Sequence, residues 1–419
     1  MDRATPDGAE MRGGDRSGAR QYNERLIMQV IRRAGGLPKA DVARSTGLSP
    51  QTVSVIVNRL LDETLLVKTD KVRGKVGQPS TLIRLNPNGA GSIGIKIGRR
   101  GLDILLMDLA GGISRRTRQS YRYPEPDSIF REIQRGLRFV YENLPDGQRQ
   151  RLVGVGVCAP SELHRWAEEL DAPADKLAEW RDVDFAARIG GMTDLPVAVM
   201  NDVAAATSAE LTLGSSIASE TCLYLYVGAF VGGGIAMSHQ LVSSARGNAC
   251  AIGSLPLTGV RDVITGRQPE QLIRRASLIF LERELEAAGF SPDVLDDLTG
   301  APRGAVAIYD GWRRTAVAAL AYAIGAAISV FDFQQVVIDS SLSRAATRVI
   351  VEDVTAALGL FNLTGLRRPI LTPGSLGADA RILGAGLMPL NAKFAPDRKL
   401  LLKLAPETGI REPEPPRGE

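Results

Sequence analysis

Cysteine, histidine and aromatic residues are scarce in this chain of 419 residues, and each scarcity excludes a class of protein. Only two histidines and three cysteines occur, and Cys158, Cys222 and Cys250 lie far apart in apolar surroundings. That distribution argues against a disulfide framework or a cysteine zinc site. Phe, Trp and Tyr make up 5% of the chain. This is too little for a protein that stacks single-stranded nucleic acid on aromatic rings.

Long hydrophobic runs are also missing. No apolar stretch reaches the roughly 18 residues that a membrane helix needs, and the first twenty residues are polar, unlike a secretory signal. We therefore expect a cytoplasmic protein with no membrane partner. Residues 1–20 and 405–419 have the composition of disordered ends. The length in between allows two or three domains.

Positive charge is concentrated near the N-terminus. Residues 1–90 hold 15 Lys and Arg against 9 Asp and Glu, whereas the remainder holds 36 against 38. A basic segment in front of a nearly neutral body is typical of a protein whose N-terminal part binds a polyanion such as DNA.

The basic segment has the pattern of a winged helix-turn-helix over residues 21–86. Apolar spacing predicts a helix over 23–33, a second within 38–47 and a third that begins after Ser49, with Pro50 at its first position. Two short strands then flank a Gly-rich basic tip. A small helical bundle with a polar face is the alternative, but the basic hairpin and the charge asymmetry favour double-stranded DNA as the partner. The expected DNA contacts are Ser49, Gln51, Thr52, Ser54 and Asn58 on the third helix, and Arg73, Lys75 and Gln78 on the wing.

Strand-like and helix-like segments alternate beyond a Gly-containing hinge at 86–91, which predicts an α/β body. A second group of such segments follows late in the chain, so two related lobes with a cleft between them are expected. The Ala-rich segment 315–331 reads as core or as a dimer contact.

Several motifs, in this order, resemble the repressor branch of the ROK family (repressors, open reading frames and sugar kinases). They are the winged helix, Asn201-Asp202 before an Ala-rich segment, and the segments 227–235, 247–257 and 375–387. The resemblance implies an actin-like body of two lobes. We expect lobe 1 over 91–205, completed by about 375–400, and lobe 2 over 206–374.

In kinases of this family the aspartate that matches Asp202 is the catalytic base, and the preceding Asn holds the sugar. The nucleotide loops implied by the resemblance are altered here. Arg99 and Arg100 lie in the first, Ala229 and Phe230 replace a Thr-Gly pair in the second, and 339–343 replaces a glycine pair near the adenosine. Phosphoryl transfer needs groups that seat ATP and magnesium, so we expect no enzyme activity and no cofactor.

The sugar side is altered as well. The family's Glu-Ile-Gly-His loop reads Ala251-Ile252-Gly253-Ser254, and the cysteine-rich zinc segment has no Cys or His at 258–272. We therefore predict no metal site. The expected effector-binding residues are Asn201, Asp202, Gly247, Asn248 and Glu270, with Ser161 and Glu162 as weaker candidates. Alternatively, Asp202 caps the helix that follows it.

These patterns predict a DNA-binding transcriptional regulator, a repressor of carbohydrate-related genes, with a degenerate effector-binding body. Two such chains as a homodimer, or a dimer of dimers, would place winged helices on the half-sites of an operator. The alternatives are a sugar kinase with an added DNA-binding domain, and a regulator with a vestigial pocket that a protein partner controls.

Overall fold

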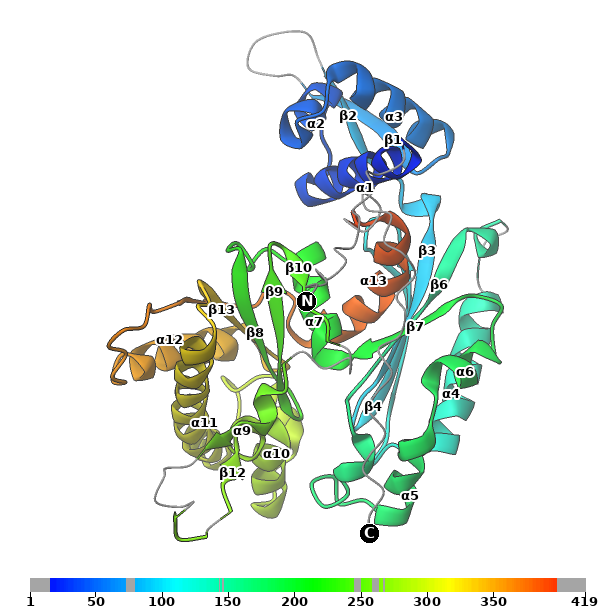
Figure 1. Cartoon of the computed structure of the whole chain (residues 1–419). Helices are drawn as coiled ribbons and strands as arrows, with labels where there is room; N and C mark the ends of the chain where they lie inside the picture. The colour runs from blue at the N-terminus through cyan, green and yellow to red at the C-terminus, as the bar shows by residue number, and fades with distance from the viewer. Residues whose placement is uncertain are drawn as a thin grey trace, which may run out of the picture. The chain divides into compact units, whose positions relative to one another are not determined.

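The computed structural model describes residues 16–72, 80–142, 144, 147–244, 250–257, 264–266 and 268–397. The chain divides into two compact units (Figure 1). One unit comprises Met1–Asn86 with Ala392–Glu419, and the other comprises Pro87–Asn391. Each unit is described by itself below.

The first unit is built from three helices and a two-stranded antiparallel sheet. Its helices bury one apolar stripe each, with Ile27, Val42 and Val57 fully inaccessible to solvent. Gly47 ends the second helix in the left-handed conformation (φ 70°). The elements are α1 (Arg16–Ala34), α2 (Lys39–Thr46), α3 (Pro50–Asp62), β1 (Leu66–Val72) and β2 (Ser80–Leu85).

The second unit begins with a lobe built on a five-stranded sheet of order β5-β4-β3-β6-β7. The first three strands are antiparallel neighbours, and β6 and β7 run parallel to β3. Figure 1 shows α4 and α6 beside this sheet. The elements are β3 (Gly91–Ile97), β4 (Gly101–Asp108), β5 (Ile113–Ser120), α4 (Pro126–Glu142), β6 (Leu152–Ala159), α5 (Ala174–Ala178), α6 (Phe185–Gly190) and β7 (Val197–Asn201).

A second lobe repeats the same topology in the order β10-β9-β8-β13-β14, again with three antiparallel strands followed by two parallel ones. Two five-stranded sheets with one strand order form the actin-like body expected from the sequence. The elements of the chain that follow β7 are α7 (Asp202–Thr212), β8 (Thr221–Val227), β9 (Val231–Met237), β10 (Gln240–Leu241), β11 (Pro256–Leu257), β12 (Glu270–Gln271), α9 (Leu272–Ala276), α10 (Leu278–Ala287), α11 (Arg303–Val330), β13 (Gln335–Ser340), α12 (Arg344–Leu358), β14 (Ile370–Pro373) and α13 (Ala380–Phe394), the last of which packs on the sheet of the first lobe.

Two helices connect the lobes at the centre of the body (Figure 1). Helix α7 packs on β9, whereas α13 packs on the first sheet, where the Ser92 hydroxyl donates to the Gly386 carbonyl at 2.6 Å. The helices approach each other so closely that a Cβ on Gly384 would lie 1.9 Å from the Ala205 carbonyl oxygen. Glycine at 384 therefore permits the crossing.

Helix α11 is the one helix of the described residues that is long and apolar enough to cross a membrane, by length and composition only. It packs against α9, α10 and α12, and it buries Leu320, Ile324 and a row of alanines. Small side chains allow such close helix packing. These contacts are those of a core helix in the second lobe.

Candidate functional site

The outward face of α3 carries the polar residues predicted to read DNA. Gln51 and Asn58 are exposed, and Thr52 and Ser54 are half-buried. Ser49 caps the helix, and its hydroxyl accepts the Thr52 backbone N–H at 3.2 Å. Most of its hydrogen-bonding capacity is therefore used within the chain.

Two residues on this surface were not singled out from the sequence. Val55 is 68% exposed between Ser54 and Asn58. The Lys39 ammonium, at the start of α2, donates to Asn58 Oδ1 at 2.7 Å and to Ser54 Oγ at 3.5 Å. No local pattern predicts a contact between side chains 19 residues apart. The wing residues Arg73, Lys75 and Gln78 lie outside the described residues.

A cavity of about 420 Å³ opens between the two lobes of the body. Its walls are mostly apolar, and most of its polar groups, Ser161, Glu162 and Asn201, lie where β6 and β7 end, with Ser243 on the other wall. The lining residues are Ala159, Pro160, Ser161, Glu162, Phe185, Val199, Met200, Asn201 and Ala204 of one wall, and Gly233, Gly234, Leu241, Val242, Ser243 and Cys250 of the other.

Asn201 is held in place by its own hydrogen bonds. Its Oδ1 accepts the backbone N–H groups of Val203 (3.0 Å) and Ala204 (3.2 Å), and its Nδ2 donates to Ser161 Oγ at 3.0 Å. Asn201 is therefore the N-cap of α7, a role that the sequence offered to Asp202 as an alternative. The remaining Nδ2 hydrogen and the Ser161 hydroxyl are left to meet a ligand.

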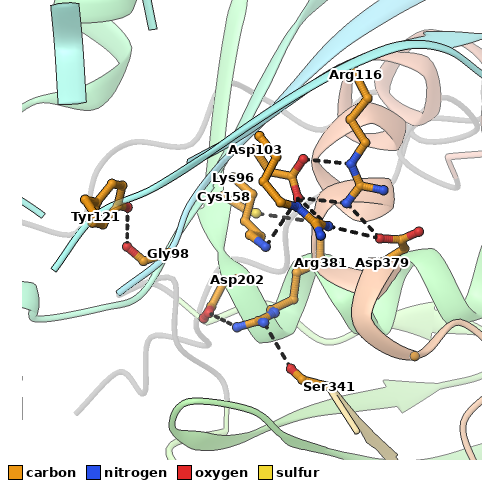
Figure 2. Close-up of polar contacts among 12 residues, drawn as sticks. Lys96, Gly98, Asp103, Arg116, Tyr121, Cys158, Asp202, Ser341, Asp379 and Arg381 are labelled. Carbon is orange, nitrogen blue, oxygen red and sulfur yellow. Dashed lines mark hydrogen bonds and ion pairs between the residues drawn. The ribbon is translucent and has the colours of Figure 1, made fainter. Parts of the chain in front are cut away.

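Asp202 points away from this wall toward α13 (Figure 2). Its carboxylate is buried and forms an ion pair with Arg381, with 3.6 Å between Oδ2 and Nη1. The guanidinium lies 4.7 Å from the centre of the Tyr226 ring and reaches Ser341 Oγ at 3.4 Å. Burial works against the charged guanidinium, but Tyr226 and Asp202 outweigh it and raise the pKa of Arg381.

A second cluster of charges lies on the neighbouring strands (Figure 2). Asp103 of β4 faces Lys96 of β3 at 3.6 Å and receives two 2.8 Å hydrogen bonds from Arg116 of β5. Burial alone would raise the pKa of Asp103, yet the bonds from Arg116 and the charge of Lys96 hold it below its ordinary value. Burial, followed by the charge of Arg381, lowers the pKa of Lys96 to about 8.

The two loops that would hold nucleotide phosphates in a kinase contact each other here. The Arg99 guanidinium carbon, in the β3–β4 loop, lies 3.9 Å from the centre of the Phe230 ring in the β8–β9 loop. The Trp166 ring also packs against Phe230 in an edge-on arrangement, with 4.8 Å between the ring centres. Phe230 is 3% exposed. A buried phenyl ring and a guanidinium thus occupy the space between these loops.

Ion pairs between the lobes flank this aromatic contact. Arg100 binds Glu282 of α10 at 2.8 Å, and Arg274 of α9 binds Glu169 at 3.1 Å. The Arg283 guanidinium also donates to the Glu169 carbonyl at 2.7 Å. The two lobes are therefore held together at this end of the body by contacts of the chain itself.

The side chain of Asp339 occupies the space at the end of β13, where the resemblance places the adenosine. Asp339 is 1% exposed and accepts hydrogen bonds from Tyr224 Oη and the Gly377 N–H, both at 3.0 Å. A Cβ on Gly374 would lie 2.2 Å from the Asp339 carboxyl carbon. The carboxyl group thus takes the space beside the glycine backbone.

Glu270, another predicted effector residue, is not among the residues that line the cavity. Glu270, on β12, is 42% exposed at its side chain and pairs with Arg275 at 2.6 Å. Gly247 and Asn248 lie outside the described residues. Among the residues that the structure describes, no three His, Cys, Asp or Glu side chains are grouped to hold a metal ion.

Comparison with known proteins agrees with this architecture. Residues 92–271 match the ROK family model, and residues 20–63 match the model for winged helix-turn-helix DNA-binding. The body therefore contains a ROK family domain over residues 92–271. The chain thus carries a DNA-binding module in front of a ROK domain, and this is the domain order of a transcriptional regulator.

The named relatives of this chain include repressors. It is 22% identical to the xylose repressor of Bacillus subtilis over 58% of this chain and 62% of that one. It is 28% identical to a transcriptional regulator of Mycobacterium bovis, over 55% and 52%. The chain therefore spans less than two thirds of these relatives. An uncharacterised protein of Sinorhizobium fredii matches over 89% and 91%, at 25% identity.

Solved structures share the fold of this chain. A ROK family transcriptional regulator described as a homologue of the E. coli MLC protein superposes with a TM-score of 0.63 at 18% identity, covering 90% of this chain and 98% of that one. A ROK family glucokinase from Streptomyces griseus superposes with a TM-score of 0.53 at 16% identity, covering 71% and 98%. The fold is thus common to regulators and kinases, and the residues of the site must distinguish them.

Proposed function

We propose that this protein is a cytoplasmic, DNA-binding transcriptional regulator, a repressor of carbohydrate-related genes, whose ROK body binds a small effector and has no kinase activity. The observation that carries this proposal is the pairing in one chain of a winged helix-turn-helix with a body whose interlobe cavity is open but whose nucleotide loops are filled. Relatives named as xylose repressors and transcriptional regulators support it.

The absence of kinase activity is inferred from the groups that the chain puts in place of nucleotide contacts. A phosphate needs backbone N–H groups or mobile cations within reach. In the first loop of this chain, the Arg99 guanidinium lies over the Phe230 ring, and Arg100 forms an ion pair with Glu282. Asp202, which matches the catalytic base of the kinases, forms an ion pair with Arg381. Asp202 is also not among the residues that line the cavity, so its carboxylate is not placed to meet a sugar hydroxyl there.

The cavity suggests the kind of effector. Phe185, Val199, Met200 and Leu241 make most of its walls apolar, and its polar groups are few: the Asn201–Ser161 edge with Glu162, and Ser243 on the opposite wall. A sugar with one hydrogen-bonding edge and one apolar face, such as a deoxy or acylated sugar, fits this lining better than a fully hydroxylated hexose. Ligand sites of this kind combine apolar walls with a few placed polar groups.

The DNA contacts proposed are those of α3 together with the wing. Gln51 and Asn58 present amides to the major groove, and the exposed Val55 presents an apolar surface that suits a thymine methyl group. A homodimer would place two such helices on half-sites about one helical turn apart. The effector would regulate binding by favouring one arrangement of the dimer over another.

Thermal unfolding against a panel of sugars, deoxy sugars, acylated sugars and sugar phosphates tests the effector site. A ligand at about 100 times its Kd adds roughly 2.7 kcal/mol to stability. The shift in Tm should disappear in Ala204→Leu, which fills the cavity, and should persist in Glu270→Gln. A shift that Ala204→Leu leaves unchanged would contradict the assignment of the cavity.

A further inference from the structure

Lys39 connects α2 to the DNA-facing side of α3. Its ammonium donates to Asn58 Oδ1 at 2.7 Å and lies 3.5 Å from Ser54 Oγ. Both partners belong to the residues proposed to face the bases, and Asn58 is exposed. A charged group from another helix thus lies among the side chains that would read the sequence.

The contact determines which atoms Asn58 presents. An ammonium group has three donors and no acceptor, so only the amide oxygen of Asn58 can face it. A hydrogen bond to a charged donor is stronger than one between neutral groups. The oxygen is thereby engaged with Lys39, and the amide nitrogen with its two hydrogens is left for the groove.

This orientation changes the base that Asn58 suits. A free asparagine reads adenine with both ends of its amide, since N7 accepts and N6 donates. When Lys39 donates to Oδ1, the oxygen keeps one lone pair, but the adenine N6 donor would have to approach it beside a positively charged donor, and this disfavours adenine. Guanine offers two acceptors, N7 and O6, to the major groove. The Asn58 Nδ2 hydrogens and the remaining ammonium hydrogen together match that pattern.

We propose that Lys39 is a specificity-determining residue, which orients Asn58 so that α3 selects guanine rather than adenine at the base pair beneath it. The inference rests on the proposed DNA binding and extends it from a general polar face to a particular base. It differs from the general rule that a free asparagine pairs with adenine.

The test is selection of binding sites from a random duplex library by the full-length protein, followed by affinities for the selected site and its single-base variants. For the wild type we expect guanine at one position of each half-site, preferred over adenine by about tenfold or more. Lys39→Met keeps the aliphatic stem and removes the donor. It should lose this preference, or reverse it toward adenine, at that position alone.

Lys68→Met is the matched control, because Lys68 is an exposed lysine of β1 in the same unit. It removes one positive charge and should leave the selected sequence unchanged. Circular dichroism checks that both variants are folded. If Lys39→Met selects the wild-type sequence with uniformly weaker affinity, Lys39 contacts only phosphate and the inference is wrong. If the wild-type chain selects no sequence at all, the DNA-binding proposal itself fails.

Discussion

Neighbouring residues at the start of α7 have separate tasks. Asn201 closes the helix and borders the cavity, whereas Asp202 turns into the body toward Arg381. The side chains of this ion pair are only 6% and 12% exposed. In an ion pair so buried, removing one partner leaves the charge of the other buried and uncompensated, and this cost is the main way in which the pair affects stability.

Asp202→Asn should therefore act on stability. It leaves the Arg381 guanidinium buried without its charged partner, and we expect the free energy of unfolding in urea to fall by about 2–3 kcal/mol. Glu270→Gln breaks an ion pair between half-exposed side chains and should cost less than about 1 kcal/mol. Equal losses in the two variants would contradict the buried role of Asp202.

Lys96 gives the protein a dependence on pH that can be isolated. Because its pKa falls from 10.5 to about 8 on folding, its charged form costs stability below pH 8, and the cost is relieved as pH rises toward 10.5. Above pH 8, wild-type stability should thus rise relative to that of Lys96→Met, by on the order of 3 kcal/mol in total. Urea unfolding of both proteins at pH 7 to 10 measures this difference. A constant difference would show that Lys96 is not perturbed.

At the scale of elements, the β3–β4 and β8–β9 loops form a contact between the lobes. Arg99 and Trp166 enclose Phe230 from the first lobe, and Arg100 reaches Glu282 of the second. This contact holds the lobes together with groups of the chain in place of a nucleotide. Any effector that moves the lobes must work against it.

Trp166 can report on that contact. In a background of Trp180→Phe and Trp312→Phe, Trp166 is the remaining tryptophan. Phe230→Ala removes the ring against which it packs, and acrylamide should then quench Trp166 fluorescence more strongly. Leu360→Ala, at a residue that is 89% exposed, serves as the control. Unchanged quenching in Phe230→Ala would mean that the loops are not in contact in solution.

The elements were predictable where their signals are local. The Ser49-Pro50 start of α3 and the Gly47 end of α2 follow from capping preferences, and the structure contains both. The contacts Lys39–Asn58, Arg99–Phe230 and Asp202–Arg381 join residues distant in sequence, so periodicity carries no information about them. Arg381 is the one arginine in segment 375–387, where most side chains are small or apolar, and this isolation is the one sequence signal that could have pointed to it.

For the whole molecule, the charge asymmetry predicts how DNA affinity responds to salt. The wing residues Arg73 and Lys75 should each neutralise a phosphate, so changing both to Ala should flatten the slope of log K against log salt by about 1.8. Arg303→Ala with Arg367→Ala removes two exposed charges from residues 87–391 and should leave the slope unchanged. Similar slopes in the wild type and the wing variant would refute the wing contacts.

The most direct test of the central claim measures whether a ligand of the body changes the affinity of the full-length protein for DNA. Fluorescence anisotropy of a labelled duplex, chosen by selection, gives the Kd of the full-length protein in the presence of each member of the sugar panel. The account predicts that at least one ligand changes this Kd by about fivefold or more in the wild type. The same ligand should have no effect on Ala204→Leu, which binds the duplex normally. If every ligand leaves the Kd unchanged, or if the filled cavity responds like the open one, the body does not regulate DNA binding through this site.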